Sequence, residues 1–388
     1  MRKMAFFIFF SIVIVIYSLV NYYIFTRGLQ AIPAGSVLRA WYIPVFWTLA
    51  ATYIAGRFLE RVWLSPVSDA LVWSGSIWLG AMLYFFLLVV FIDLIRLVNH
   101  FIPFLPGFVG ENYTRFKLYL LGGSVLLVGV IVLAGYINAL NPRIKTVEIN
   151  IPKQANGLES LNAVVMSDIH LGTMIGNGRL ERIVNKANGL NPDIILLPGD
   201  ILDEDLEPVI RQNAGATLEQ LSAPMGVFGV MGNHEYIGGP EPAYRYLSEH
   251  GIKMLRDSVV RINDSFYLVG REDFQKGRFA GKERKSIELL MEEVIDKNLP
   301  VIVLDHQPFH PEMAAAAGAD LMLSGHTHNG QLWPLNYIID AMYVIGYGLG
   351  QVDGMHMYVS NGVGTWGPPL RIGNRPEIVH LKIKFGKN

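Results

Sequence analysis

Long apolar stretches dominate the first part of the chain. Four of them carry no charged residue, at positions 4–26, 40–56, 70–92 and 118–142. A helix needs roughly 20 apolar residues to cross a hydrocarbon core about 30 Å thick. The first, third and fourth stretches reach that length, whereas the second is shorter. The pattern predicts a transmembrane region of four helices over residues 1–142, with three spans as the alternative.

After position 142 the apolar runs become short, and turn residues separate them. Buried strands are predicted at 163–166, 193–197, 227–231, 301–304 and 321–323, helices at 180–190, 209–221, 243–250 and 287–298, and a β-hairpin at 259–269. Alternating strands and helices are typical of helices that cover a sheet. Residues 143–388 are therefore predicted to form a layered α/β domain.

Charge separates the two parts further and excludes some functions. Of 32 Lys and Arg residues only nine precede position 141, and of 33 Asp and Glu residues only four do. The rest of the chain is mildly acidic and has no basic block, which argues against a nucleic-acid partner. The chain has no cysteine, which excludes disulfides and thiolate metal sites.

Basic residues that flank the apolar stretches bear on orientation. With four spans, one membrane face carries the N-terminus and the C-terminal domain, and it holds seven Lys and Arg residues against five on the other face. The positive-inside rule then predicts an integral protein of the cell membrane with its C-terminal domain in the cytoplasm. Asp93 and Arg96, three positions apart near the end of the third stretch, predict a local ion pair, with a transport path as the alternative.

Side chains that can bind metal follow the predicted strands. They are Asp168 and His170, then Asp200, then Asn233 with His234 beside it, then His306, and finally His326 and His328. Residues two apart on an extended backbone point to the same side, and the carboxyl ends of parallel strands meet at one edge of a sheet. An Asp-x-His triplet alone occurs by chance in polar strand ends. Five such groups in order, which contain five of the ten histidines, predict a metal site.

The ligand types and their neighbours suggest distinct roles. Nitrogen and oxygen ligands without sulfur suit Mn, Fe or Zn. Gly199 permits a tight turn that leaves Asp200 exposed at the rim, where its two oxygens could bridge two cations. Asp203 is expected to support this loop. His234 follows the expected ligand Asn233 and is left to act on the substrate or its leaving group.

The motif series resembles that of the calcineurin-like metallophosphoesterases. It comprises Asp168-x-His170, Gly199-Asp200-x-x-Asp203, Gly232-Asn233-His234-Glu235, His306 and Gly325-His326-x-His328. The run 325–331 together with the tail 368–378 is similar to the bacterial membrane-associated phosphodiesterase-like branch. The resemblance covers residues 147–383 and none of the membrane part. One departure is Asn329, where the family often has glycine.

This resemblance implies a fold, a metal pair and an activity. The fold would be a four-layer α-β-β-α sandwich. One metal would take Asp168, His170, Asp200 and His328, and the other would take Asp200, Asn233, His306 and His326. The two divalent ions would generate a hydroxide that attacks phosphorus. His234 is the candidate catalytic residue, because an imidazole with a pKa near 6.5 can contact the phosphate or protonate the leaving oxygen.

The surroundings suggest a substrate that is itself in the membrane. Anchoring confines enzyme and lipid to one surface, so we expect hydrolysis of a phosphodiester or pyrophosphate bond in a lipid-linked substrate. Arg371 or Arg375 could bind its phosphate or could instead brace the tail. The apolar segment 332–349 could form an entrance near the bilayer or pack as core, and the basic loop 275–285 could meet lipid headgroups or be an ordinary solvated loop. Alternatives are an anchored phosphoprotein phosphatase and a non-enzymatic metal-binding scaffold.

Overall fold

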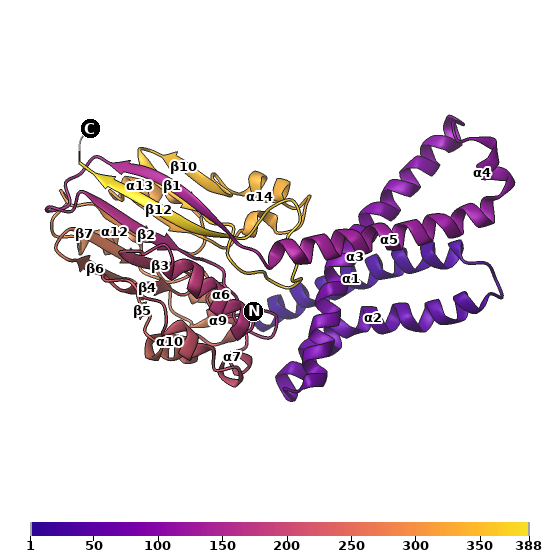
Figure 1. The fold of residues 1–388 in the computed structure, drawn as a ribbon, viewed down its shortest axis with the longest axis horizontal. Coiled ribbons are helices and arrows are strands. Elements are labelled where there is room, and N and C mark those ends of the chain that lie inside the picture. Colours follow the sequence, from indigo (N-terminus) through magenta and orange to yellow (C-terminus); the bar gives the residue numbers. More distant parts are fainter. Residues whose placement is uncertain (1, 387–388) are drawn as a thin grey trace. The chain divides into compact units, whose positions relative to one another are not determined.

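Residues 2–386 form an all-helical first unit and a mixed α/β second unit in the computed structural model (Figure 1). The first unit ends at Gly135 and the second begins at Tyr136. The first unit contains α1 (Arg2–Ala31), α2 (Val37–Val62), α3 (Pro66–Phe101), the short α4 (Gly107–Glu111) and most of α5 (Tyr113–Ala139). Ser36 and Ser65 cap α2 and α3, because their hydroxyls accept hydrogen bonds from first-turn N–H groups.

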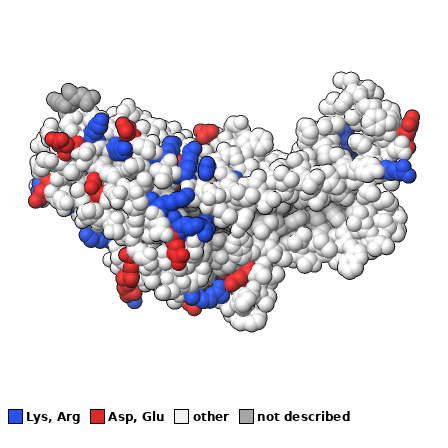
Figure 2. Space-filling model, viewed as in Figure 1, with Lys and Arg blue, Asp and Glu red and all other residues white. Residues whose placement is uncertain are grey.

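Three helices of the described residues are long and apolar enough to cross a membrane. They are Ser11–Ala31 within α1, Pro66–Phe101 and Tyr113–Ala139. Helix α2 is not among them; it carries Arg39, Arg57, Glu60 and Arg61. By length and composition the described residues thus give three candidate spans, one fewer than predicted, and α2, which packs along α3, is compatible with a fourth. Charged residues are sparse on the helical unit and frequent on the second unit in the view of Figure 2.

Two glycines allow α2 and α3 to approach closely. A Cβ added at Gly75 would lie 2.3 Å from the Cα of Tyr53, and one at Gly56 would lie 2.7 Å from the backbone N of Val72. In a membrane, small residues at a helix crossing allow the backbone contact that drives packing. Helices α2 and α3 consequently form the tight pair of this unit, and α1 packs against both.

The second unit is built on two six-stranded sheets. One sheet has the order β1 (Arg143–Ile151), β12 (Glu377–Phe385), β2 (Ser160–Val165), β3 (Ile194–Pro198), β4 (Val227–Val230) and β5 (Lys253–Met254). The other has the order β10 (Gly348–Val352), β11 (Met355–Val359), β9 (Leu321–Ser324), β8 (Val301–Leu304), β7 (Phe266–Gly270) and β6 (Ser258–Ile262).

Parallel pairing brings the ends of the central strands to common edges. Strands β2, β3, β4 and β5 pair in parallel, as do β11, β9, β8 and β7. In β2 and β3, for example, Ala163 lies opposite Ile194 and Val165 opposite Leu196. Antiparallel pairs, β12 with β2, β10 with β11 and β6 with β7, occur towards the outer strands. The loops that carry the expected ligands all leave the carboxyl ends of parallel strands.

The two sheets pack face to face, and helices cover their outer faces. Leu196 and Phe228 of one sheet share a buried cluster with Leu268 and Leu323 of the other. On the outer face of the second sheet, Leu290 of α12 (Ile287–Glu292) and neighbouring α13 (Pro311–Ala316) join a separate cluster. Helix α6 (Asn177–Asn188) buries one apolar side. The architecture is thus the expected sandwich of helix, sheet, sheet and helix.

Several short helices complete the unit and refine the predictions. They are α7 (Glu207–Arg211), α8 (Ala214–Leu218), α9 (Asn233–Gly238), α10 (Pro240–Glu249), α11 (Lys276–Phe279), η1 (His328–Gly330) and α14 (Asn336–Met342). The predicted helix 209–221 is two helices, because Asn213 adopts a left-handed φ of 53° between them. The predicted helix 287–298 ends at Glu292. The hairpin predicted at 259–269 is formed by β6 and β7.

Candidate metal centre

The loop after β2 presents two expected ligands through an unusual backbone. Asp168 and His170 both have φ near 53°, a left-handed conformation that few non-glycine residues adopt. Their N–H groups donate to the carbonyls of Gly199 (3.1 Å) and Asp200 (3.0 Å), which joins this loop to the loop after β3. Backbone strain of this kind persists only where surrounding contacts hold it, and it is frequent at functional sites.

Gly199 is needed where the loop after β3 turns. Its φ is 86°, and a Cβ there would lie 2.5 Å from Nδ1 of His306. Asp200 follows with a φ of 50°. Glycine at this position therefore permits both the turn and the close approach of the imidazole.

The first ligand group joins Asp168, His170 and His328. One donor atom from each lies within 4.8 Å of the others, and all three side chains are buried. The Nε2 atoms of His170 and His328 are 3.0 Å apart, and Nε2 of His328 is 3.6 Å from Oδ1 of Asp168. Side chains 160 positions apart in the sequence thus converge on one point.

The second ligand group joins Asp200, His306 and His326 at the same spacing. Nε2 of His306 lies 3.1 Å from Oδ2 of Asp200 and 3.2 Å from Oδ1 of Asn233. Nδ1 of His306 donates to the carbonyl of Pro198 (2.9 Å), which turns Nε2 towards these oxygens. The expected ligand Asn233 therefore belongs to this group.

Asp200 lies between the two groups. Its Oδ2 is 3.8 Å from Nε2 of His170 in the first group and 3.1 Å from Nε2 of His306 in the second. Its other oxygen accepts a hydrogen bond from the backbone N–H of His234 (2.9 Å). Hydrogen bonding thus fixes the Asp200 carboxylate between the two ligand groups.

The buried polar atoms of the site fit divalent cations. Oδ2 of Asp168 and Nδ1 of His170 are buried and have no hydrogen-bond partner among the described residues. A buried polar atom without a partner is costly, and a carboxylate oxygen more so. Burial also raises the pKa of Asp168 to about 6, although His306 lies nearby. A cation would relieve this unfavourable burial, so the residues present suit a metal centre.

Three of the expected imidazole ligands are held in the uncharged form that metal ligands require, whereas Asp200 outweighs burial and raises the pKa of the fourth, His306, well above its usual value. Burial, and secondarily neighbouring histidines, lower the pKa of His170 and of His326 to about 3. Burial and the neighbouring Arg371 lower the pKa of His328 well below its usual value. Three of the four expected imidazole ligands therefore keep a lone pair free at neutral pH.

His234 differs from these imidazoles in charge. Burial lowers its pKa, but Asp200 and Asp203 outweigh that effect and raise it to about 9. Nδ1 of His234 lies 3.1 Å from Oδ1 of Asp203, and its ring is 4.6 Å from that of His170. His170, Asp203 and His234 also form a third group with metal-ligand spacing. Asp203, which was expected to support its loop, thus also contacts His234, which is a cation beside the site.

Arg371 is directed at the protein and not at an open site. It is 1% exposed, and its guanidinium donates to the carbonyls of His328 (2.9 Å) and Gly364 (2.7 Å). Its Nη2 lies 2.9 Å from Nδ1 of His328. The amide of Asn138, in the last turn of α5, donates to the carbonyl of Arg371 (2.9 Å). Of the two readings of the tail arginines, bracing accounts for these contacts. Arg375 likewise donates to a carbonyl, that of Asn141 (3.2 Å).

Two contributors to the site went unassigned in the sequence. Glu235 is 1% exposed, and its carboxylate accepts from the N–H groups of Asp200, Leu202 and Gly232, so it braces two ligand loops. Its position directly after Asn233-His234 in the sequence could have indicated this role. Trp366 lies 5.7 Å from His234 and is 51% exposed; no pattern marked it.

Asn329 occupies the position after His328 where glycine was expected. Its φ of 47° and ψ of 43° are left-handed. Asparagine tolerates this conformation better than other non-glycine residues, because its short amide can bond locally. The backbone after His328 thus keeps the turn without glycine.

Comparisons with known proteins agree with this geometry. Residues 161–330 match the calcineurin-like phosphoesterase family. A "transmembrane protein with metallophosphoesterase domain" from Danio rerio is 32% identical over 274 residues, which cover 67% of this chain and 62% of that protein. The chain thus spans under two thirds of that relative's length.

Bacterial relatives are matched over more of their length. An uncharacterized metallophosphoesterase of Campylobacter jejuni is 28% identical over 99% of this chain and 100% of its own. Another, from Aquifex aeolicus, is 32% identical over 62% of this chain and 92% of its own. On this similarity the chain belongs to the calcineurin-like metallophosphoesterases.

Proposed function

We propose that the second unit hydrolyses a phosphoester bond with two divalent cations. One cation is held by Asp168, His170, Asp200 and His328, and the other by Asp200, Asn233, His306 and His326. The observation that carries the proposal is the position of Asp200, whose Oδ2 lies 3.8 Å from His170 and 3.1 Å from His306. When bound, such a pair supplies an activated water and neutralises charge on the phosphate.

The protein's own residues complete the reaction. His234 is charged near neutral pH and stands at the ligand groups, so it is suited to bind the phosphate and donate a proton to the leaving oxygen. Asp203 holds its Nδ1 and orients the ring. Trp366 forms an apolar wall beside His234. We assign Arg371 the role of positioning His328 in place of direct contact with the phosphate.

An exposed apolar surface supports a lipid-linked substrate. We call it the α14 patch: Trp333, Tyr337, Ile338, Met342 and Val344, each at least half exposed. Helix α14 buries none of its residues. It also packs closely on the turn that carries His328, since a Cβ at Gly330 would meet the backbone N of Asn336 at 2.4 Å. These residues are exposed, so the prediction that segment 332–349 packs as core is wrong for them. Their exposure supports the alternative of an apolar entrance to the site.

The basic loop 275–285 contributes less to this argument. Lys276 pairs with Asp257 (2.8 Å), Arg284 with Asp305 (2.9 Å) and Lys285 with Glu293 (2.9 Å). These pairs satisfy most of the loop's basic side chains within the protein. These contacts favour an ordinary solvated loop over a loop that binds lipid headgroups.

The test compares substrates on the purified full chain with Mn²⁺. We expect turnover of a lipid-linked phosphodiester or pyrophosphate in mixed micelles to exceed that of a soluble phosphodiester with the same leaving group. Equal turnover of both would contradict the hypothesis of a lipid-linked substrate but not the hydrolase activity. Preference for a phosphopeptide would favour the anchored phosphoprotein phosphatase, and metal binding without any turnover would favour the scaffold.

We further propose that the second unit faces the cytoplasm, as the excess of basic residues indicates when α2 is counted as a fourth span. The cysteine-free chain allows a direct test. Lys297, an exposed residue of the second unit, can be changed to cysteine. A membrane-impermeant maleimide should then label it in inside-out vesicles and leave it unlabelled in intact cells; the reverse pattern contradicts the assignment.

A further inference from the structure

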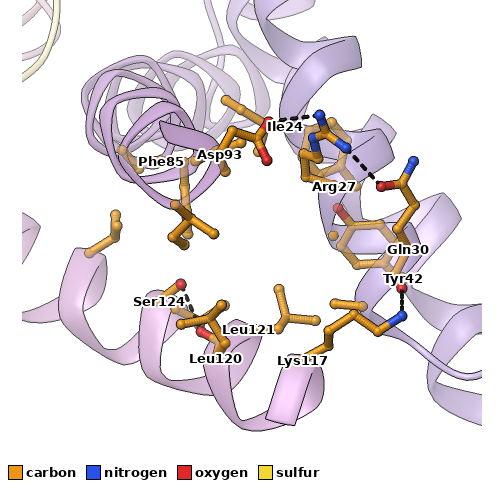
Figure 3. Close-up of a pocket in the computed structure, with 18 of the residues that line it drawn as sticks. Ile24, Arg27, Gln30, Tyr42, Phe85, Asp93, Lys117, Leu120, Leu121 and Ser124 are labelled. Atoms are coloured by element: carbon orange, nitrogen blue, oxygen red, sulfur yellow. Dashed lines mark hydrogen bonds and ion pairs between the residues drawn. The ribbon is translucent and has the colours of Figure 1, made fainter. Parts of the chain in front are cut away.

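The helical unit contains a large, open cavity of its own. It has a volume of about 990 Å³ and is lined by α5 on one side and by α1, α2 and α3 on the other (Figure 3). This volume lies at the upper end of the range for small-molecule sites, roughly 300–1,000 Å³. Helix α5 takes no part in the close packing of the other three long helices. The cavity is therefore the space that separates α5 from them.

Most of the cavity wall is apolar. Phe46, Trp78 and Phe85 line it from α2 and α3, facing Leu121 and Val128 of α5. Lining positions on α5 run from 113 to 132, and the part from Lys117 onwards corresponds to about 22 Å of helix axis. One leaflet contributes about half of the ~30 Å hydrocarbon core. The apolar part is thus long enough to accommodate the acyl chain of one leaflet.

One end of the cavity is charged. Arg27, Arg96 and Lys117 line it together with a single acid, Asp93. Nη2 of Arg27 lies 2.7 Å from Asp93, and Nη1 of Arg96 lies 3.2 Å from the same carboxylate. Figure 3 shows Arg27 and Asp93 across the opening from Lys117, which donates to the carbonyl of Gln30 (2.9 Å).

Asp93 cannot neutralise this end. One carboxylate serves two guanidiniums and also accepts from the hydroxyl of Tyr23 (2.6 Å). Lys117 has a neutral carbonyl as its partner, and Nε of Arg27 is buried with no hydrogen-bond partner among the described residues. The lining residues thus carry two positive charges in excess. Charge of this kind near an apolar membrane interior is costly unless an anion balances it.

We propose that this cavity binds one anionic phospholipid. Its phosphate lies among Arg27, Arg96 and Lys117, where guanidinium groups can form charge-assisted hydrogen bonds, and an acyl chain runs along α5. This lipid is bound and not hydrolysed, since the first unit holds no group of the candidate metal centre. Binding of this lipid does not depend on the phosphoesterase activity of the second unit.

The test titrates lipid into the full chain purified in a neutral detergent, followed by native mass spectrometry. The probes are phosphatidylglycerol, phosphatidylcholine with the same acyl chains, and inorganic phosphate. The variant is Arg96→Gln with Lys117→Gln, which removes the two excess charges. The control is Arg115→Gln, an exposed residue two positions before Lys117 that does not line the cavity.

We expect one phosphatidylglycerol to bind saturably, at least tenfold more tightly than phosphatidylcholine. Its dissociation constant should rise at least tenfold in the double variant and stay within twofold in Arg115→Gln. Arg96→Gln alone, with a half-exposed side chain, serves if the double variant does not fold. Equal binding of both lipids, equal loss in the control, or binding of inorganic phosphate as tight as that of the lipid would each overturn the proposal.

Discussion

The two units of this protein position their charged side chains in different ways. In the second unit, Asp168, His170 and Asp200 leave strand ends with left-handed backbones, and each is fixed by hydrogen bonds between neighbouring loops. In the first unit, Arg27, Arg96 and Lys117 project from regular helices towards an open cavity. Metal coordination needs donor atoms placed within tenths of an ångström, whereas recognition of a lipid phosphate needs only positive charge beside apolar space. The strained backbone is found where the geometry has to be exact.

The largest expected effect follows from removing the residue shared by both ligand groups. Asp200→Asn keeps the shape but loses the charge that two cations require. We expect phosphoesterase activity to fall on the order of 10³-fold or more and bound metal to drop below two ions per chain, measured by inductively coupled plasma mass spectrometry. Retention of two ions with full activity would show that the two cations do not need Asp200 as a shared ligand.

His234→Ala should lower turnover by about 10²- to 10³-fold while both metals stay bound. Because we assign it proton donation, the loss should be large for an alkyl phosphodiester and small for a p-nitrophenyl phosphodiester, whose leaving group needs no proton. Kinetics on the two substrates measure this difference. An equal loss on both would show that the residue acts through structure or phosphate binding alone.

Arg371→Lys should weaken metal binding by about 10- to 100-fold, the range typical of residues that orient a ligand. Lysine retains the charge but cannot reach the carbonyls of both His328 and Gly364 as the guanidinium fork does. A metal titration that follows enzyme activity provides the measurement. Restoration of turnover at high metal concentration is expected, and an unaltered metal affinity combined with a raised KM would favour phosphate contact instead.

The smallest effect concerns the α14 patch. Changing Tyr337 and Ile338 to serine should raise KM for a lipid-linked substrate several-fold, because less apolar surface meets the bilayer, and should leave a soluble substrate unaffected. Leu289, an equally exposed residue on α12, provides a matched control as Leu289→Ser. Equal changes on both substrates would indicate a folding defect.

The sequence predicted the elements whose signal is local. Buried strands such as β3 and β8 are continuous apolar runs, and ligands follow them directly. Strands β1 and β12 were missed because each contains charged residues between its apolar ones and so forms no continuous apolar run. The break at Asn213 depends on a single left-handed residue.

Some contacts within the site had no local signal in the sequence. Trp366 reaches His234 from a loop more than 100 positions away, and Arg371 meets His328 only through the tertiary fold. The cavity of the helical unit depends likewise on how α5 packs, which hydropathy does not encode. The charged pair of Asp93 and Arg96 was predicted from its spacing, whereas the part played by Arg27 and Lys117 emerged from the structure.

The claim that Asp200 joins two cations is tested most directly by electron paramagnetic resonance of the chain loaded with Mn²⁺. Two manganese ions about 3.5–4 Å apart, the usual separation in two-metal sites, should give the broad multiline spectrum of a spin-coupled pair. That signal should disappear in Asp200→Asn. The six-line spectrum of isolated manganese in the fully loaded wild-type protein would contradict the account.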